Sequence, residues 1–191
     1  MNSMYLKDSS VALSLIVGLG NVGDKYQDSR HNVGFSFIEI LKSTLEKNLQ
    51  LVPEVTEEKE YSAYYFRILG LTLLKPKLFM NKSGDSIVAH LKYKKLKDYK
   101  EMLVVHDDLD IAFGKYKLHL SKSPKAHNGV LSIEFALKTT QFYRLRIGID
   151  NRSDRTIPAS NFVLMNMNDD EKSILDGLIT DIIRTELGIE V

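Results

Sequence analysis

The sequence contains no cysteine among its 191 residues. That absence excludes a disulfide framework, a zinc site built on thiolates and a catalytic cysteine nucleophile. No apolar run approaches the ~18 residues that a membrane-spanning helix needs, so we expect a protein that does not enter a membrane. The formal net charge is only +1, and so weak a charge neither requires nor excludes a nucleic-acid partner.

The length and composition are those of one globular domain with a core of its own. Apolar residues make up 43% of the chain and charged residues 27%, both ordinary values for globular proteins. The apolar segment near the N-terminus runs directly into a glycine motif, which cleavage of a signal peptide there would destroy. We therefore expect a cytoplasmic protein.

Strand and helix patterns alternate along the chain. Apolar or alternating runs predict strands at 13–18, 61–69, 71–75, 102–105, 115–120 and 143–150. Apolar spacings of three and four predict helices at 34–49, after residue 83, at 128–138 and at 169–187. A charged turn is predicted at 54–60. Interleaving of this kind predicts a single α/β domain, with a twisted mixed sheet and helices on both faces.

The stretch 14–34 carries the most informative pattern. Three glycines follow the first predicted strand with the spacing G-x-G-x-x-G, at Gly18, Gly20 and Gly23. This spacing is typical of dinucleotide-binding loops, but such a loop opens a helix at once. Here residues 24–30 have no apolar stripe, and the predicted helix starts about ten residues late. A Rossmann-type NAD(P)-binding protein is therefore an alternative, whereas we expect the glycines to turn the backbone so that Asn21 and His31 face one cleft.

Polar clusters lie where the predicted elements end. They carry histidine, asparagine or carboxylate groups and occupy residues 30–32, 79–84, 106–110 and 126–129. Sites in open α/β sheets form beyond the strand ends, so we expect a shared polar cleft in which a histidine can act as a base. The His-Asp-Asp-Leu-Asp run at 106–110 could alternatively hold a metal ion. The sequence has no G-x-S-x-G nucleophile elbow, which leaves an α/β serine hydrolase without support.

Five motifs in order resemble those of bacterial-type peptidyl-tRNA hydrolases and span essentially the whole chain. They are V-G-L-G-N-V-G-x-x-Y-x-x-x-R-H-N-V-G (17–34), K-P-K-L-F-M-N-K-S-G (75–84), V-V-H-D-D-L-D (104–110), H-N-G (127–129) and R-L-R-I-G-I (144–149). The resemblance implies hydrolysis of the ester between a peptide and the 3′ ribose of tRNA, which frees the tRNA for reuse. It also implies a monomer that needs no metal, no cofactor and no obligate protein partner.

The same resemblance implies roles for individual residues. His31 matches the catalytic histidine, the general base that activates water, and Asp107 matches its aspartate partner. The asparagines that bind the terminal peptide unit, position the water or stabilise the oxyanion would be Asn21, Asn81 and Asn128. The remaining cleft residues would be Tyr26, Met80 and His127. The basic residues that hold a tRNA phosphate would be Lys115, Lys117 and Arg146.

Three features depart from the family pattern. Val22 stands where the family usually has proline. The segment 119–126 is about two residues longer than the glycine-rich segment common there, which leaves its mobility and its contact with tRNA open. Residues 1–11 extend the single domain 1–191 at its N-terminus, and for them we expect disorder. A catalytically silent tRNA-binding relative is a second alternative, although the complete set of catalytic-type residues argues against it.

Overall fold

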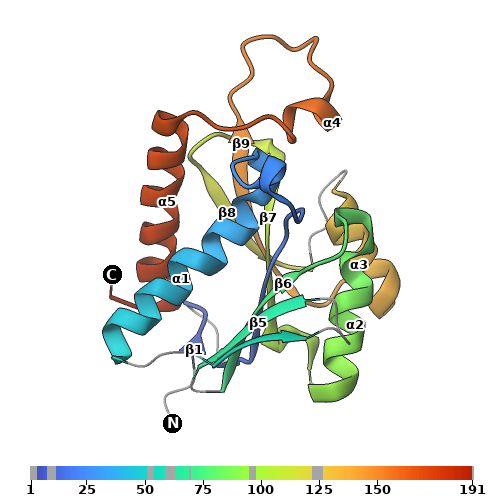
Figure 1. The fold of residues 1–191 in the computed structure, drawn as a ribbon, viewed down its shortest axis with the longest axis vertical. Helices are drawn as coiled ribbons and strands as arrows, with labels where there is room; N and C mark the ends of the chain where they lie inside the picture. The colour runs from blue at the N-terminus through green and yellow to red at the C-terminus, as the bar shows by residue number, and fades with distance from the viewer. Residues whose placement is uncertain are drawn as a thin grey trace.

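A computed structural model describes residues 4–7, 12–50, 54–58, 63–68, 70–94, 98–121 and 127–190. Within these residues, seven strands form one sheet with helices on both faces (Figure 1). The strands are β3 (Leu15–Gly18), β4 (Glu54–Glu58), β5 (Ala63–Ile68), β6 (Leu71–Pro76), β7 (Met102–Ala112), β8 (Tyr116–Leu120) and β9 (Tyr143–Asp150). The helices are α1 (Val33–Leu49), α2 (Ser83–Lys94), α3 (Asn128–Leu137), the single turn α4 (Ala159–Phe162) and α5 (Asp169–Leu187). This architecture confirms the predicted α/β class with a mixed sheet.

Four parallel strands form the middle of the sheet, in the order β6-β3-β7-β9. At one edge β5 and β4 continue antiparallel from β6, and at the other edge β8 runs antiparallel to β9. The central strands are buried on both faces, which is why they show nearly unbroken apolar runs. Parallel strands bring their carboxyl ends to one side of the sheet, so the segments that follow β3, β7 and β9 meet there.

Two apolar cores, one on each face of the sheet, hold the helices. On one face α1 and α5 bury residues such as Phe37 and Ile182, and on the other α2 and α3 bury Ile87 and Ile133. Each fully buried side chain of this size contributes about 1.5–3 kcal/mol. The helices therefore pack their periodic apolar faces against the sheet, as the sequence pattern predicted.

Three parts of the chain differ from their predictions. Residues 54–60, predicted to be a turn, contain β4, which lies at the edge of the sheet, where charged residues are common because they prevent further pairing. The strand predicted at 102–105 continues to Ala112, because its polar residues still pair with β9. The N-terminal extension is not disordered throughout: Met4–Tyr5 (β1) pairs with Ala12–Leu13 (β2), and Leu6 is buried in the core of α1 and α5. Residues 1–3 and 8–11 lie outside the described residues.

The glycine motif mainly allows α1 to pack closely. A Cβ on Gly18 would lie 2.1 Å from the carbonyl oxygen of Gly34 in α1, and one on Gly20 would lie 2.7 Å from the ring of Phe35. Of the three glycines, Gly23 alone has a positive φ, at 106°, so it makes the turn. The prediction that all three serve a turn is therefore wrong for two of them.

We expect the substitution Gly18→Ala to lower the free energy of unfolding by about 1–3 kcal/mol, because the added methyl group meets backbone of α1 rather than a flexible side chain. Gly177→Ala in α5 is the matched control. Nothing lies within 4 Å of its added Cβ, and alanine favours a helix by about 0.5–1 kcal/mol. Urea unfolding followed by circular dichroism measures both variants, and equal changes in them would contradict the close packing of α1.

Candidate active site

A histidine–aspartate pair lies toward the carboxyl ends of the parallel strands, where β3 has ended at Gly18 and β7 continues. Nδ1 of His31 is 2.7 Å from Oδ1 of Asp107, and both side chains are buried. His31 lies in a one-turn 3-10 helix (Arg30–Asn32) just before α1, and Asp107 lies in β7. An ionised carboxylate only accepts hydrogen bonds, so Nδ1 of His31 must donate. Its Nε2 then carries no proton and can accept one.

His127 contacts the same carboxylate oxygen from a second direction. Its Nε2 lies 3.0 Å from Oδ1 of Asp107. Its Nδ1 accepts the backbone N–H groups of Gly129 and Val130, at 3.2 and 3.3 Å, and so caps α3. Because Nδ1 is an acceptor, the proton of this imidazole is on Nε2. His127 is thus a second donor to Asp107, which its sequence motif did not reveal.

Burial and electrostatic contacts within this cluster shift the pKa values of its titratable groups. Burial acts to raise the pKa of Asp107, but electrostatic attraction to the rings of His31 and His127 and their hydrogen bonds hold it far below its usual range. Burial acts to lower the pKa of His31, but the charge of Asp107 and its hydrogen bond outweigh burial and raise the pKa above 6.5. The neighbouring His106 is fully buried, and burial holds its pKa well below 6.5. His106 is therefore neutral, with its Nδ1–H donated to the carbonyl oxygen of Asp107 at 2.7 Å.

The pair borders a cleft of about 410 Å³. His31, Asp107 and His127 line it together with Asn128, whose side chain is exposed at the start of α3. Another wall comes from the segment after β9, through Arg152, Ala159, Ser160 and Val163. The motifs did not indicate this wall, although its place beyond the carboxyl end of a parallel strand was a usable signal.

Asn21 lines a second cavity, of about 500 Å³, beside the start of α1, and His31 is not part of that lining. Asn32, the residue after His31, joins Asn21 to the loop that carries His31. Its Oδ1 accepts the backbone N–H of Asn21 at 2.7 Å, and its Nδ2 donates to the backbone carbonyl of Asn21 at 3.0 Å. Oδ1 of Asn21 accepts the backbone N–H of Met80 at 3.1 Å, which fixes the orientation of its amide.

Three predicted substrate residues lie outside the lining of both cavities as the described residues define them. Met80 is buried in the core formed with α2 and α3. Asn81 is exposed in the turn before α2, and Tyr26 is half-buried under the ammonium group of Lys25.

The predicted phosphate-binding residues lie at the edge formed by β8 and β9. Lys117 is directly opposite Arg146 in the antiparallel register, so their side chains share one face. Lys115 and Lys117 are exposed, whereas Arg146 is buried and its Nε donates to Asp108 at 2.6 Å. The unusual part of the loop that follows, at 122–126, lies outside the described residues.

The geometry does not favour a metal ion. The ligand atoms of His31, Asp107 and His127 lie within 4.8 Å of one another. Binding there would remove the proton from Nε2 of His127 while Nδ1 still accepts from α3, and an imidazolate is a costly species at neutral pH. In the 106–110 run the carboxylates also diverge, since Asp108 binds Arg146 and the backbone N–H of Asp110.

The fold and this cluster define an α/β enzyme with a buried histidine–aspartate pair. The family model for peptidyl-tRNA hydrolase matches residues 15–186. A peptidyl-tRNA hydrolase of Campylobacter concisus is 37% identical over 170 residues, covering 87% of this chain and 84% of that protein. One of Neisseria meningitidis serogroup C is 39% identical over 152 residues, covering 78% and 76%.

A solved structure shows the same likeness in three dimensions. The crystal structure of peptidyl-tRNA hydrolase from Acinetobacter baumannii matches with a TM-score of 0.75 and 33% identity, over 87% of this chain and 83% of that one. The chain therefore belongs to the peptidyl-tRNA hydrolase family, and it is a hydrolase. In the part of the chain that the structure describes, no helix has the length and hydropathy needed to cross a membrane.

We expect the imidazole of His31 to titrate above the ordinary value of 6.5. The substitution Asp107→Asn should lower that pKa, because burial then disfavours the imidazolium and no carboxylate opposes it. An NMR titration of the histidine ring protons measures the shift, with His90 of α2 as the internal control. A pKa of His31 that stays the same in Asp107→Asn would show that the pair does not set it.

Proposed function

We propose that this protein hydrolyses the ester that joins a peptide to the 3′ ribose of tRNA, with His31 as the general base, and so returns tRNA to translation. The observation that carries the proposal is the 2.7 Å contact between Nδ1 of His31 and Oδ1 of Asp107. In the neutral imidazole, donation from Nδ1 leaves Nε2 unprotonated, on a residue that lines the cleft. The names of the related proteins supply the substrate class.

The reaction begins when Nε2 of His31 takes a proton from water as the water oxygen attacks the ester carbonyl carbon. The tetrahedral intermediate then expels the 3′ oxygen of the ribose, which takes the proton back from the imidazolium. Asp107 stays ionised throughout and stabilises the transient positive charge on His31. General base catalysis of this kind contributes about 10²–10⁴-fold to the rate.

Asn128 is the amide that we assign to the reacting centre. It lines the cleft with His31, and it opens α3, whose positive end favours the negative charge that develops on the carbonyl oxygen. Its amide can hold the attacking water or donate to the oxyanion.

We assign recognition of the peptide to Asn21, together with Asn81 and Tyr26. Because Oδ1 of Asn21 is occupied by the backbone of Met80, its Nδ2 group is the one that can donate to a substrate carbonyl. A site that hydrogen-bonds a peptide amide discriminates against a free aminoacyl ester, since a charged amine would leave buried groups unpaired.

We assign the tRNA phosphate to the basic edge of β8 and β9. Lys115 and Lys117 are exposed there, and Arg146 lies opposite Lys117 with its Nε held by Asp108. The ion pair orients the guanidinium, so the two lysines supply most of the accessible charge.

The direct test is release of the amino acid from an N-blocked aminoacyl-tRNA. We expect His31→Ala to lower kcat by about 10²–10⁴-fold, because the substitution removes the proposed general base. His119→Ala in β8 is the control for loss of a histidine outside the cleft. Full activity in His31→Ala would exclude the general-base role, and a wild-type protein that binds tRNA without cleaving it would be the silent relative.

Salt dependence tests the assignment of the phosphate site. We expect Lys117→Ala to raise KM at low salt and to reduce the slope of log KM against log salt by about 1, because one phosphate contact is lost. The kcat at saturating substrate should stay close to that of the wild type. Lys47→Ala at the end of α1 is the matched control, and an identical salt slope in both variants would move the phosphate site elsewhere.

A further inference from the structure

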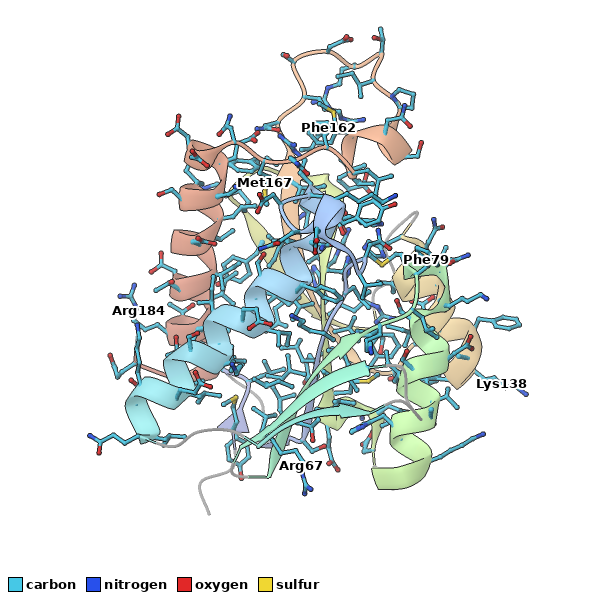
Figure 2. All side chains as sticks on the ribbon, in the orientation of Figure 1. Arg67, Phe79, Lys138, Phe162, Met167 and Arg184 are labelled. Atoms are coloured by element: carbon cyan, nitrogen blue, oxygen red, sulfur yellow. The ribbon has the colours of Figure 1, made fainter. Side chains whose placement is uncertain are left out.

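One wall of the cleft is a short segment between β9 and α5. Residues 159–167, here called the strap, comprise α4 and the turn that follows it, and Ala159, Ser160 and Val163 line the cleft. Figure 2 shows Phe162 below the loop that follows β9 and Met167 near the start of α5. The strap therefore lies between the cleft and the first turn of α5.

The strap is bonded along its length to the loop that carries His31. The backbone N–H of His31 donates to the carbonyl of Val163 at 2.8 Å, and that of Met167 donates to the carbonyl of Asp28 at 2.9 Å. An isolated β-bridge lies between these two bonds, where Ser29 pairs with Asn166. The general base and the cleft wall thus form one unit of backbone.

The buried side chain of Arg30 also joins the loop to the strap. Its Nη1 donates to the carbonyls of Met165 and Asn166, at 3.2 and 2.9 Å. Its Nη2 forms an ion pair with Glu171, and its guanidinium lies 4.5 Å from the ring centre of Phe162. Arg30 is only 5% exposed, so these contacts replace the hydration of its two Nη groups.

Glu171 connects the arginine to the rest of the fold. It belongs to the capping box of α5 with Asn168, and it accepts Nδ2 of Asn151, just beyond β9, at 2.6 Å. Burial acts to raise the pKa of Glu171, but the hydrogen bonds of Asn151, Asn168 and Arg30 hold it below its usual range. Glu171 is therefore a carboxylate at neutral pH that holds three segments together.

We propose that Arg30 and Glu171 are positioning residues, which clamp the strap onto the loop 28–31 and thereby hold Nε2 of His31 at the distance that proton transfer needs. The 3-10 helix that carries His31 has one turn and no side-chain cap, so its own bonds do not fix its place. Displacing a catalytic group by about 1 Å can cost 10²-fold in rate. This inference rests on the proposed role of His31.

The chain contains a matched control for the clamp. Arg144 makes the same set of contacts at a distance from the strap: its Nη1 donates to two carbonyls, its Nη2 pairs with Glu134, and its guanidinium lies over Phe142. Glu134→Gln and Glu171→Gln therefore remove the same charge from the same kind of buried arginine. They differ in whether the arginine touches the strap, and Glu171 also has its bonds to Asn151 and Asn168.

The experiment compares these two variants with the wild type in the N-blocked aminoacyl-tRNA assay and in hydrogen exchange followed by mass spectrometry. In Glu171→Gln we expect kcat to fall by about 10–10²-fold, with KM changed less than about threefold. Exchange should speed up in peptides covering 28–31 and 159–167. Glu134→Gln should keep both kcat and the exchange of those peptides, whatever its loss in melting temperature.

Two results would overturn the clamp. Either Glu171→Gln and Glu134→Gln have the same kcat, or the peptides 28–31 and 159–167 exchange as slowly in Glu171→Gln as in the wild type. Failure of the proposed function looks different, since the wild type is then inactive or His31→Ala is fully active. The exchange measurement still tests the clamp in that case, because it does not depend on turnover.

Discussion

Asp107 accepts hydrogen bonds from His31 and His127 on one carboxylate oxygen, and the site is organised around that shared acceptor. The first bond fixes the tautomer that gives His31 a free nitrogen. The second ties the carboxylate to the start of α3, because the other nitrogen of His127 caps that helix. Removing the carboxylate from this buried place would therefore disturb both the base and a helix, since each imidazole would lose its partner.

Hydrogen bonds of this kind need a rigid frame. The parallel strands supply it by placing the ends of β3 and β7 side by side, and Gly18 lets α1 approach until His31 reaches Asp107. The two apolar cores then hold α1 and α3 against opposite faces of the sheet. The cluster of His31, Asp107 and His127 is thus held between α1 and α3, both of which are packed against the sheet.

Local pattern was enough to predict most of this frame, because periodic apolar faces are a property of neighbouring residues. β9 and α5 were predicted with their observed bounds, and His31 and Asp107 lie together as the polar clusters implied, although Asp107 lies within β7 rather than beyond its end. The extension of β7 and the strap depend on hydrogen bonds to distant segments. The side of the loop that Asn21 faces depends on its bond to Met80, a partner that spacing does not reveal.

The contacts of Arg30 join segments that are synthesised far apart in time. The bonds of Arg30 to Met165 and Asn166 join residues 135 and 136 positions apart, and its partner Glu171 is 141 positions away. A chain emerging from the ribosome acquires His31 well before the first turn of α5. Long-range contacts of this kind form late in folding, since the intervening loop must close first. With the proposed clamp, His31 therefore reaches its final position only after Glu171 has been synthesised.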